Sequence, residues 1–387
     1  MRFCFVSEVF PYRKNEKLVI PGGGEAHAFF LSRELVKRGH EVKMISGRWE
    51  GTPEHEVIDG IEFIRYGSYS PWFDEPIVIS LKNMAINTIS CFRVLKEVIQ
   101  RDRPDFIVTP MSFAFPRAFM LAKMHKIPLI AEVHDVYEVP LYLEHYKKDY
   151  GLLVYPGLFY VWLYNNLPRY ADLVETVSAQ NVEPMVRSYG IAREKIFITG
   201  NGIEIEKYEY SEKKQQVIAV LGRLVSYKRV DMAIEIFKQV KKRVPDVRLI
   251  IVGDGPDRKR LMKLAKDEDI EFKGFVPEGE KIKILQRAKI LLSCSEFEGF
   301  GIAPIEALAC GAYPVVSDIP AHREVLGKHG ILFKEASEAV PRICYLLHEE
   351  EERQRLTKKG REYVEATYTW QKVCDRFLKV VESLMRM

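Results

Sequence analysis

The stretch Glu298-Gly-Phe-Gly-Ile-Ala-Pro-Ile-Glu306 carries two carboxylates eight positions apart. A Gly-Phe-Gly turn separates them, and its glycines, Gly299 and Gly301, let the backbone approach a ligand closely and adopt positive φ at little cost. The apolar run Ala288–Cys294 comes just before this stretch and is expected to form a strand. The segment therefore predicts a strand, a tight loop and a helix in succession, the repeating unit of open α/β sheets.

The second half of this stretch is expected to begin a helix over Ile302–Leu308. Pro304 is tolerated in a first helical turn, because its missing N–H has no partner to lose there. The free amides and the dipole at such a terminus favour a phosphate. Glu298, in the loop before those amides, can touch the group attached to the phosphate. Glu306, expected about two turns along the helix, can reach a ribose on the other side.

This arrangement resembles the E-x7-E signature of the retaining glycosyltransferases of family 4 (glycosyltransferase group 1). The resemblance implies a GT-B fold, an α/β architecture of two Rossmann-like domains facing a central cleft. It also implies that Glu298 hydrogen-bonds the transferred sugar and that Glu306 hydrogen-bonds the ribose of the donor nucleotide. Donor binding by the turn between them is then expected of Gly299, Phe300, Gly301 and Ile302.

Length and composition limit the number of domains and the class of protein. A chain of 387 residues exceeds one comfortable core and predicts two domains. The composition, 47% hydrophobic and 29% charged, is ordinary for a soluble protein, and a net charge of +4 gives no argument for nucleic acid. The six cysteines are scattered without a C-x-x-C pair, which argues against a disulfide scaffold and a zinc site. The N-terminus is not typical of a signal peptide, so we expect a cytoplasmic enzyme.

Apolar runs rich in β-branched residues alternate with helical patterns from end to end, which predicts parallel sheets with helices on both faces. The first series of expected strands is Arg2–Val6, Glu41–Ile45, Glu62–Arg65, Asp105–Thr109, Pro128–Val133 and Leu173–Val177. The second series is Val217–Leu221, Arg248–Val252, Glu271–Lys273, Ile290–Ser293 and Tyr313–Val316.

We place the break between the two series in the polar region 190–216. The first domain is expected at about 1–190 and the second at about 200–350. The resemblance implies that the first is the acceptor-side domain, that the second binds the nucleotide sugar, and that the final helix, about 369–387, returns to the first domain.

The segment Val220-Leu-Gly-Arg-Leu-Val-Ser-Tyr-Lys-Arg229 runs from a strand into a glycine and then presents Arg223 and Lys228. Arginine offers a fork of donors and lysine a point charge, and both stabilise a leaving diphosphate. Cations at a helix start oppose its dipole, so two of them need a reason. The segment is similar to the family's G-R-x-x-x-x-K pattern, which implies that both residues hold the diphosphate. The alternative is a pair of solvated surface charges.

Two further loops of the second domain are similar to family motifs. Gly253 and Gly255 flank Asp254 in a segment like the family's V-G-x-G-P loop, and we interpret Asp254 as a cap of the following helix rather than a ligand contact. Phe275 and Val276 lie in a segment that resembles the loop whose backbone contacts the nucleobase.

In the first domain, Pro21-Gly-Gly-Gly-Glu-Ala-His27 precedes the helical pattern Ala28–Arg38. Glycines at a helix start can bring backbone amides against a phosphate or a reacting sugar. The segment resembles the family's G-G-x-E-x-H motif, and a plain glycine-rich turn is the alternative. The residues expected to contact substrate are Gly22, Gly23, Gly24 and Glu25. The charged insertion before them, Tyr12–Val19, is expected to be mobile.

The strand ending Ile130-Ala-Glu-Val-His-Asp135 presents His134 at its carboxyl end. The resemblance implies that His134 hydrogen-bonds the donor sugar from the other side of the cleft. A histidine satisfied by local backbone is the alternative. With Glu298, Arg223 and Lys228, this residue completes the expected catalytic set.

No metal and no cofactor beyond the nucleotide sugar are expected. Asp267-Glu-Asp269 matches the D-x-D pattern by which other glycosyltransferases hold a divalent metal. It follows a charged helical segment rather than an apolar strand, so we interpret it as a solvated turn.

Residues 150–164 contain no charge and many aromatic side chains. The run is shorter than the ~20 residues of a membrane span, and Pro156-Gly157 interrupts it. A buried helix is one reading. A surface that touches lipid or a lipid-linked acceptor is the other, with Lys147, Lys148 and Arg169 nearby.

The resemblance, together with these observations, implies a retaining, metal-independent transfer of a hexosyl group from a UDP-, GDP- or ADP-linked sugar to an acceptor hydroxyl on a sugar, a lipid-linked carrier or a small polyol. A nucleotide-sugar epimerase of the same fold is one alternative. It is not expected to carry all four charged motif residues, and it would isomerise its substrate without an acceptor. A non-catalytic nucleotide-sugar-binding subunit is the other, and it would bind nucleotide without turnover.

Overall fold

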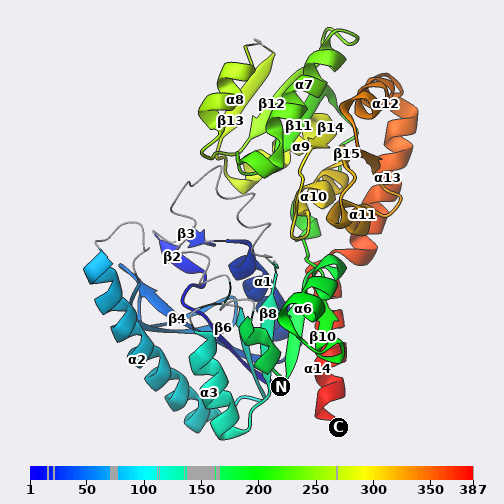
Figure 1. The fold of residues 1–387 in the computed structure, drawn as a ribbon. Coiled ribbons are helices and arrows are strands. Elements are labelled where there is room, and N and C mark those ends of the chain that lie inside the picture. Colours follow the sequence, from blue (N-terminus) through cyan, green and yellow to red (C-terminus); the bar gives the residue numbers. More distant parts are fainter. Residues whose placement is uncertain are drawn as a thin grey trace. The chain divides into compact units, whose positions relative to one another are not determined.

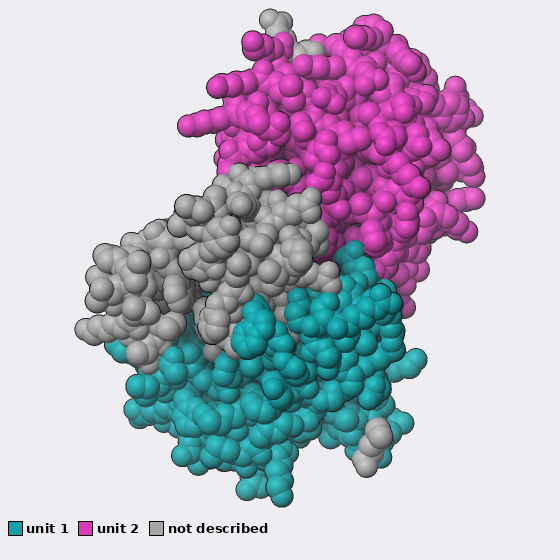
Figure 2. Space-filling view, in the orientation of Figure 1, with its two compact units in different colours: residues 1–137, 159–199, 373–387 teal, residues 138–158, 200–372 magenta. Residues whose placement is uncertain are grey.

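The computed structural model describes residues 1–14, 17–20, 22–69, 77–110, 112, 114–134, 136, 162, 166–266 and 269–386, with the side chains of 68, 69 and 77–85 excepted. The described residues fall into two compact units, which are coloured in Figure 2. Unit 1 comprises those within 1–137, 159–199 and 373–387, and unit 2 comprises those within 200–372. Each unit is an α/β sandwich with its own sheet (Figure 1).

Unit 1 contains an eight-stranded sheet in the order β10-β9-β8-β7-β1-β4-β6-β5. Neighbouring strands pair in parallel except β5 and β6, which are antiparallel. The strands are β1 (Arg2–Val6), β4 (Glu41–Trp49), β5 (His55–Ile58), β6 (Ile61–Tyr69), β7 (Phe106–Pro110), β8 (Leu129–Val133), β9 (Leu173–Thr176) and β10 (Ile196–Ile198). Its helices are α1 (Gly23–Lys37), α2 (Ile77–Asp102), α3 (Phe115–His125) and α6 (Val182–Tyr189), with 3-10 turns at Leu167–Tyr170, Ala179–Asn181 and Arg193–Lys195.

Helices cover both faces of this sheet. The side chains of β1 alternate between the two faces, so they contact helices on each side. Cys4 and Val6 belong to a core cluster shared with α2, α3 and α6. Phe3, on the other face, stacks on Phe106 and contacts Phe377 of the last helix, α14 (Trp370–Met385). From residue 373 onward, α14 therefore packs within unit 1.

Unit 2 contains a six-stranded, all-parallel sheet in the order β13-β12-β11-β14-β15-β16. The strands are β11 (Gln215–Leu221), β12 (Arg248–Val252), β13 (Ile270–Gly274), β14 (Ala288–Ser293), β15 (Tyr313–Ser317) and β16 (Ile331–Phe333). The helices are α7 (Val230–Lys241), α8 (Arg258–Leu264), α9 (Glu278–Arg287), α10 (Ile302–Cys310), α11 (Pro320–Leu326), α12 (Ala336–His348) and α13 (Glu350–Thr367), with 3-10 turns at Ile205–Lys207 and Ser226–Lys228.

The order of the unit 2 strands determines where a ligand site can form. From β11 the chain builds outward through β12 and β13, and it then returns to add β14 on the other side of β11. Strand order reverses between β11 and β14, and open parallel sheets bind ligands at the carboxyl ends of the strands at such a point. The loops after β11 and β14 carry the two motifs with the strongest expected chemistry.

In the insertion Tyr12–Val19, strands β2 (Tyr12–Lys14) and β3 (Lys17–Val19) pair antiparallel, and the expected mobility of this segment stays a prediction. Two sequence-based expectations are corrected by this fold. Helix α1 begins at Gly23 rather than Ala28, so its first turn contains the glycines. Glu306 lies four residues into α10, which is just over one turn at about 3.6 residues per turn, rather than two turns.

Strands β5, β10 and β16 were not expected because they are short and lie at sheet edges, where the hydrophobic signal is weak. Among the described residues, no helix combines the length and the apolar character needed to cross a membrane. Apart from Trp162, residues 150–164 lie outside the described part of the chain, so both readings of that segment stay predictions.

Candidate functional site

The loops after β11 and β14 meet at the carboxyl edge of the unit 2 sheet. The backbone N–H of Glu296 donates to the carbonyl oxygen of Tyr227 at 2.8 Å and ties one loop to the other. The short 3-10 turn Ser226–Lys228 ends just before α7, so Lys228 stands where the chain turns back over the sheet. Two motifs 70 residues apart in sequence therefore share one surface.

Lys228 and Glu298 form the central contact of this surface. Lys228 Nζ lies 2.5 Å from Glu298 Oε2, and Ser295 Oγ donates to Glu298 Oε1 at 2.7 Å. The two side chains of the ion pair are 18% and 17% exposed. A lysine that is paired but still reachable can exchange its carboxylate partner for an incoming phosphate.

Arg223 belongs to the same loop and is exposed. Its Nη2 donates to the hydroxyl of Tyr227 at 2.8 Å. Its guanidinium fork and the ammonium of Lys228 therefore follow one strand end, the arrangement that the sequence predicted for a diphosphate.

The glycines of the loop after β12 have a structural role that the sequence did not reveal. A Cβ on Gly253 would stand 1.8 Å from the carbonyl oxygen of Gly222, and a Cβ on Gly255 would stand 2.3 Å from that of Leu224. Gly253 also has φ +136°, a conformation that L side chains rarely adopt. These glycines therefore let the β12 loop press against the β11 loop that carries the cations.

Asp254, between those glycines, does not cap α8 as expected. Its Oδ1 accepts from the backbone N–H of Gly255 at 2.8 Å, and its Oδ2 pairs with Arg258 at 2.9 Å. The residue before the first turn of α8 is Asp257. Asp254 thus braces its own loop and the first helical residue.

Glu306 is held by two residues that sequence reasoning missed. Tyr208 OH donates to Glu306 Oε1 at 2.8 Å, and Lys281 Nζ of α9 lies 2.6 Å from the same oxygen. Burial, followed by the Glu306 carboxylate, raises the pKa of Tyr208 well above its usual range, so Tyr208 stays a donor. Neither residue has a local sequence signal, because Tyr208 is 98 residues and Lys281 25 residues from Glu306.

At the start of α10, buried side chains hold a turn whose backbone amides are expected to bind the donor. Gly301, at φ +92°, is the residue just before α10. Phe300 is buried against Tyr368, and the two rings make a T-shaped contact at 5.8 Å. The Phe300 side chain therefore anchors the turn, and only backbone atoms of this residue can serve a ligand. A Cβ on Gly301 would lie 3.4 Å from the ring of buried His322, whose Nδ1 lies 2.8 Å from the Ser317 carbonyl oxygen.

Phe275 and Val276 follow β13 at the same edge of the sheet. Phe275 is 88% exposed, which is unusual for a large aromatic side chain. Asp269, at the other end of β13, pairs with Lys241 at 2.5 Å, whereas Asp267 and Glu268 of the D-x-D pattern lie outside the described residues.

The predicted unit 1 residues occupy the start of α1 and the end of β8. A Cβ on Gly22 would stand 2.5 Å from Glu25 Oε2, so this glycine makes room for a carboxylate that folds back over the helix start. Burial raises the pKa of Glu25. A Cβ on Gly23 or Gly24 would meet no described atom within 4 Å, which leaves the first turn open to a ligand.

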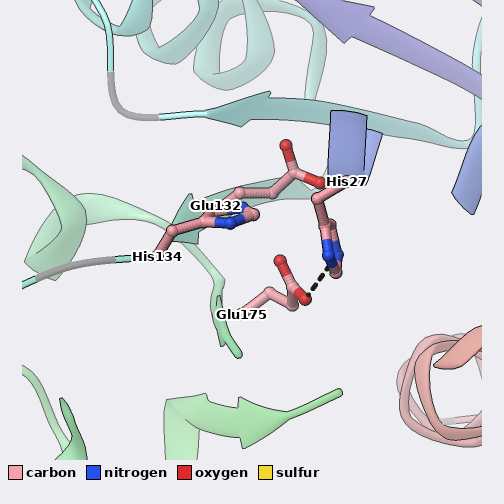
Figure 3. Close-up of side chains that lie close together, drawn as sticks. All are labelled: His27, Glu132, His134 and Glu175. Atoms are coloured by element: carbon pink, nitrogen blue, oxygen red, sulfur yellow. Dashed lines mark ion pairs between the residues drawn. The ribbon is translucent and has the colours of Figure 1, made fainter. Parts of the chain in front are cut away.

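His134 lies in a cluster with His27 of α1, Glu132 of β8 and Glu175 of β9 (Figure 3). One ligand-type atom from each of the four lies within 4.8 Å of the others. His27 Nε2 stands 3.1 Å from Glu175 Oε1, and the two imidazole rings meet edge to face at 4.7 Å. The sequence singled out His134 but not Glu132 or Glu175, although a carboxylate inside a buried parallel strand is itself an uncommon signal.

Burial dominates the electrostatics of this cluster. It raises the pKa of Glu132 to about 8, with the Glu175 carboxylate adding to the rise. It lowers the pKa of His134 to about 4, with His27 as the second cause. Burial also opposes ionisation of Glu175, but His27, His134 and the hydrogen bond from Thr199 together lower the pKa of Glu175 below its usual value.

Two family models match the chain. The model described as "Glycosyltransferase Family 4" matches residues 21–207, and the one described as "Glycosyl transferases group 1" matches residues 203–363. The first match contains α1 and the strand end at His134, and the second contains every predicted donor-site residue of unit 2.

Relatives and solved structures agree with these matches. A sulfoquinovosyl transferase of Arabidopsis thaliana is 26% identical over 364 residues, which cover 87% of this chain and 66% of the relative. The sucrose-phosphate synthase of Thermosynechococcus elongatus has a TM-score of 0.75 at 16% identity, covering 100% of this chain and 99% of that one. Anabaena HepE, solved with UDP-glucose, has a TM-score of 0.71 at 15% identity, covering 99% and 100%. At such identities the structural likeness shows the fold alone.

Proposed function

Because the chain belongs to the group 1 glycosyltransferases of family 4 and has their GT-B fold, we propose that it moves a hexosyl group from a nucleoside diphosphate sugar to an acceptor hydroxyl, with retention of configuration. The observation that carries this proposal is the contact of Lys228 with Glu298 at the strand-order reversal of unit 2. It joins a cation suited to a leaving phosphate with a carboxylate suited to a sugar hydroxyl.

The donor is proposed to exchange partners with groups that are already in place. The diphosphate is proposed to replace Glu298 as the partner of Lys228. It also accepts hydrogen bonds from the Arg223 guanidinium and from backbone amides at the start of α10, where the helix dipole favours an anion. Glu298 then accepts from the transferred sugar, while Glu306, held by its two partners, accepts from the ribose.

The chemical step is proposed to run on one face of the sugar. The bond between the anomeric carbon and the phosphate oxygen breaks, and a bond forms between that carbon and the acceptor oxygen. The departing phosphate oxygen receives the acceptor proton, so no group on the protein must change its protonation state. His134 is proposed to contact the transferred sugar, as the resemblance implies.

The charge that develops on the leaving diphosphate is proposed to be met by Arg223 and Lys228 instead of a metal bridging the phosphates. Preorganised cations of this kind stabilise developing charge without further reorganisation. Asp269, the described aspartate that ends the D-x-D pattern, pairs with Lys241, which supports its interpretation as part of a charged turn.

The test begins with the donor. The full chain is screened by thermal shift against UDP-, GDP- and ADP-linked sugars, since a bound ligand raises apparent stability by mass action. UDP-glucose is the first choice because HepE, which shares the fold, was solved with it. The best donor is then incubated with a panel of hydroxyl acceptors, and NMR reads the anomeric configuration of the product.

We expect a glycoside with the anomeric configuration of the donor, formed without added Mg²⁺ or Mn²⁺. A product of inverted configuration would overturn retention, and a strict requirement for millimolar Mg²⁺ would overturn diphosphate neutralisation by the two cations alone. An isomerised donor without acceptor would point to an epimerase. Nucleotide binding without turnover across the panel would point to a binding subunit.

The acceptor and its location are proposed more broadly. We expect a cytoplasmic enzyme whose acceptor is a sugar, a small polyol or a lipid-linked hydroxyl, with residues 150–164 as the segment that could meet a membrane surface. Trp162, the described residue of that segment, is 54% exposed. Flotation with anionic liposomes tests the lipid contact, and failure to co-float would remove it.

A further inference from the structure

Two buried carboxylates stand side by side in unit 1. Glu132 of β8 and Glu175 of β9 are register partners in parallel pairing, so their side chains leave the same face of the sheet at neighbouring positions. Both are 0% exposed. Two such groups cannot both ionise without a compensating positive charge, because burial and mutual repulsion both disfavour the charged forms.

The polar atoms of the cluster lack the partners that burial demands. Both carboxylate oxygens of Glu132, Oε2 of Glu175 and Nε2 of His134 are buried without a hydrogen-bond partner among the described residues. Buried polar atoms of native proteins almost always have partners, and orphaned groups point to an ion or water that joins them. Here the four side chains lie close together (Figure 3), with one ligand-type atom of each within 4.8 Å of the others.

Protons alone do not complete this arrangement. A proton on Glu132 would cancel one charge, but neither Glu132 oxygen has an imidazole nitrogen of the described residues as a hydrogen-bond partner that could accept it. His134 Nε2 would stay without a partner as well. A single cation can engage one ligand atom from each of the four residues.

We infer that His27, Glu132, His134 and Glu175 bind one divalent transition-metal ion, with Zn²⁺ as the first candidate. Two imidazole nitrogens and two carboxylate oxygens suit zinc and its first-row neighbours, whereas Mg²⁺ and Ca²⁺ prefer all-oxygen sites. Metal–ligand bonds of about 2.0–2.2 Å place ligand atoms roughly 3 to 4 Å apart. The observed atoms, all within 4.8 Å of one another, need only small side-chain movements to reach this geometry.

The cluster also has the second layer of contacts that metal ligands need. Thr199 Oγ1 donates to Glu175 Oε1 and orients that carboxylate. Asn181 Nδ2 donates to the carbonyl oxygen of His134 at 2.9 Å and to Thr176 Oγ1 at 3.0 Å, which holds the end of β8 against β9. Such outer contacts fix ring and carboxylate orientations around a metal.

All four proposed ligands belong to unit 1, whereas the residues proposed to hold the donor phosphates belong to unit 2. The inference departs from the sequence-based expectation of a metal-free protein, which had no view of Glu132 and Glu175 together. Metal on Nε2 of His134 would leave the proton on Nδ1, so that nitrogen could still donate to a sugar. The inference does not depend on the proposed function, because it is tested on the resting protein without donor.

The test uses the untagged full chain. Elemental analysis by mass spectrometry measures zinc and other transition metals per chain as purified. The protein is then stripped with a chelator, and Co²⁺ is added while visible absorption and thermal stability are followed. We expect one equivalent of bound metal, the d–d bands of nitrogen- and oxygen-ligated Co²⁺, and a higher melting temperature with metal than without.

Isosteric variants locate the site. Glu132→Gln and Glu175→Gln preserve shape but remove ligand charge, and each should raise the dissociation constant for Co²⁺ at least as much as the 10–100-fold that loss of a second-shell partner costs. The double variant should bind no stoichiometric metal. His348→Gln, a change at an exposed histidine of unit 2, should bind like the unchanged protein. Circular dichroism checks that each variant is folded.

Three outcomes would overturn the inference. The first is purified protein without stoichiometric metal that also shows no response to Zn²⁺ or Co²⁺, which would leave a proton-sharing cluster in its place. The second is Co²⁺ binding that survives both substitutions. The third is an intense thiolate-to-cobalt band, which would move the metal to one of the cysteines.

Discussion

Unit 1 and unit 2 each gather charged side chains at the carboxyl ends of parallel strands, but they compensate those charges differently. In unit 2, Glu298 and Glu306 each lie within 2.6 Å of a lysine. In unit 1, both oxygens of Glu132 lack a hydrogen-bond partner among the described residues. The carboxylates of unit 2 have positive partners without a ligand, whereas Glu132 of unit 1 needs one more positive group.

The difference teaches what each site can do. A paired, partly exposed lysine can exchange its carboxylate partner for a phosphate and later take the carboxylate back. We therefore expect the ion pairs of unit 2 to open when a donor binds and to close when it leaves. A buried set of ligands exchanges its bound group more slowly and suits a group that stays bound through turnover. Reversible binding and permanent binding therefore follow from exposure as much as from residue type.

The largest expected effect comes from breaking the central pair of unit 2. Lys228→Ala should cut turnover by on the order of 10²–10³, the scale of losing one preorganised donor to developing charge. Steady-state kinetics at saturating donor measures it, with Lys242→Ala, an exposed lysine of the same unit, as the matched control. Near-normal turnover of the Lys228 variant would contradict the diphosphate assignment.

The second effect tests the ribose contact. Glu306→Gln should raise the donor KM by about 10–100-fold, because hydrogen bonds to a charged group contribute roughly 1.5–3 kcal/mol. The change also leaves Lys281 without its carboxylate. Exposed Glu351→Gln is the control. An unchanged KM together with a normal affinity for the free nucleotide would show that Glu306 serves the fold instead.

A third prediction extends the comparison to a half-buried lysine of unit 2. Lys214 Nζ donates to the carbonyl oxygens of Leu285 and Cys310 at 3.2 and 2.8 Å, and burial lowers its pKa from 10.5 to about 7. Between those values the unfolded chain binds the proton and the folded chain does not, so this group makes stability rise with pH from 7 toward 10.5.

Lys214→Met should therefore remove a rise in unfolding free energy of up to about 1.4 kcal/mol per pH unit in that window. Urea unfolding at several pH values measures the slope, and exposed Lys213→Met is the matched control. Equal slopes for the Lys214 variant and the unchanged protein would mean that Lys214 stays charged in the folded state.

The smallest expected effect concerns the support of Glu306. Tyr208→Phe removes one hydrogen bond to that carboxylate, a net loss of about 0.5–1.5 kcal/mol, and should raise the donor KM by a few-fold. Lys281 still holds the carboxylate in the variant. Tyr210→Phe, which removes a bond to Thr357, should leave KM unchanged. An effect as large as that of Glu306→Gln would mean that Tyr208 contacts the donor itself.

Much of the unit 2 site could be predicted from the sequence, because its motifs are local. A strand followed by Gly222, Arg223 and Lys228 presents cations at a strand end wherever that strand lies. Parallel pairing then brings the loop after β14 to the same edge. The hydrogen bond from Tyr208 to Glu306 could not be predicted, because the two residues are 98 positions apart and neither lies in a local motif that indicates the other.

The amino-acid sequence by itself determined the alternation of strands and helices, the two series of strands and the residue types that end them. These follow from periodicity and turn chemistry, which act over a few residues. Only the tertiary structure decided which charges face one another. Glu132 and Glu175 are neighbours because of the register of β8 against β9. The antiparallel pairing of β2 with β3 likewise could not be predicted from their charged sequence. Burial and register come from contacts between distant segments, and they determine whether a charged side chain meets a partner, a ligand or neither.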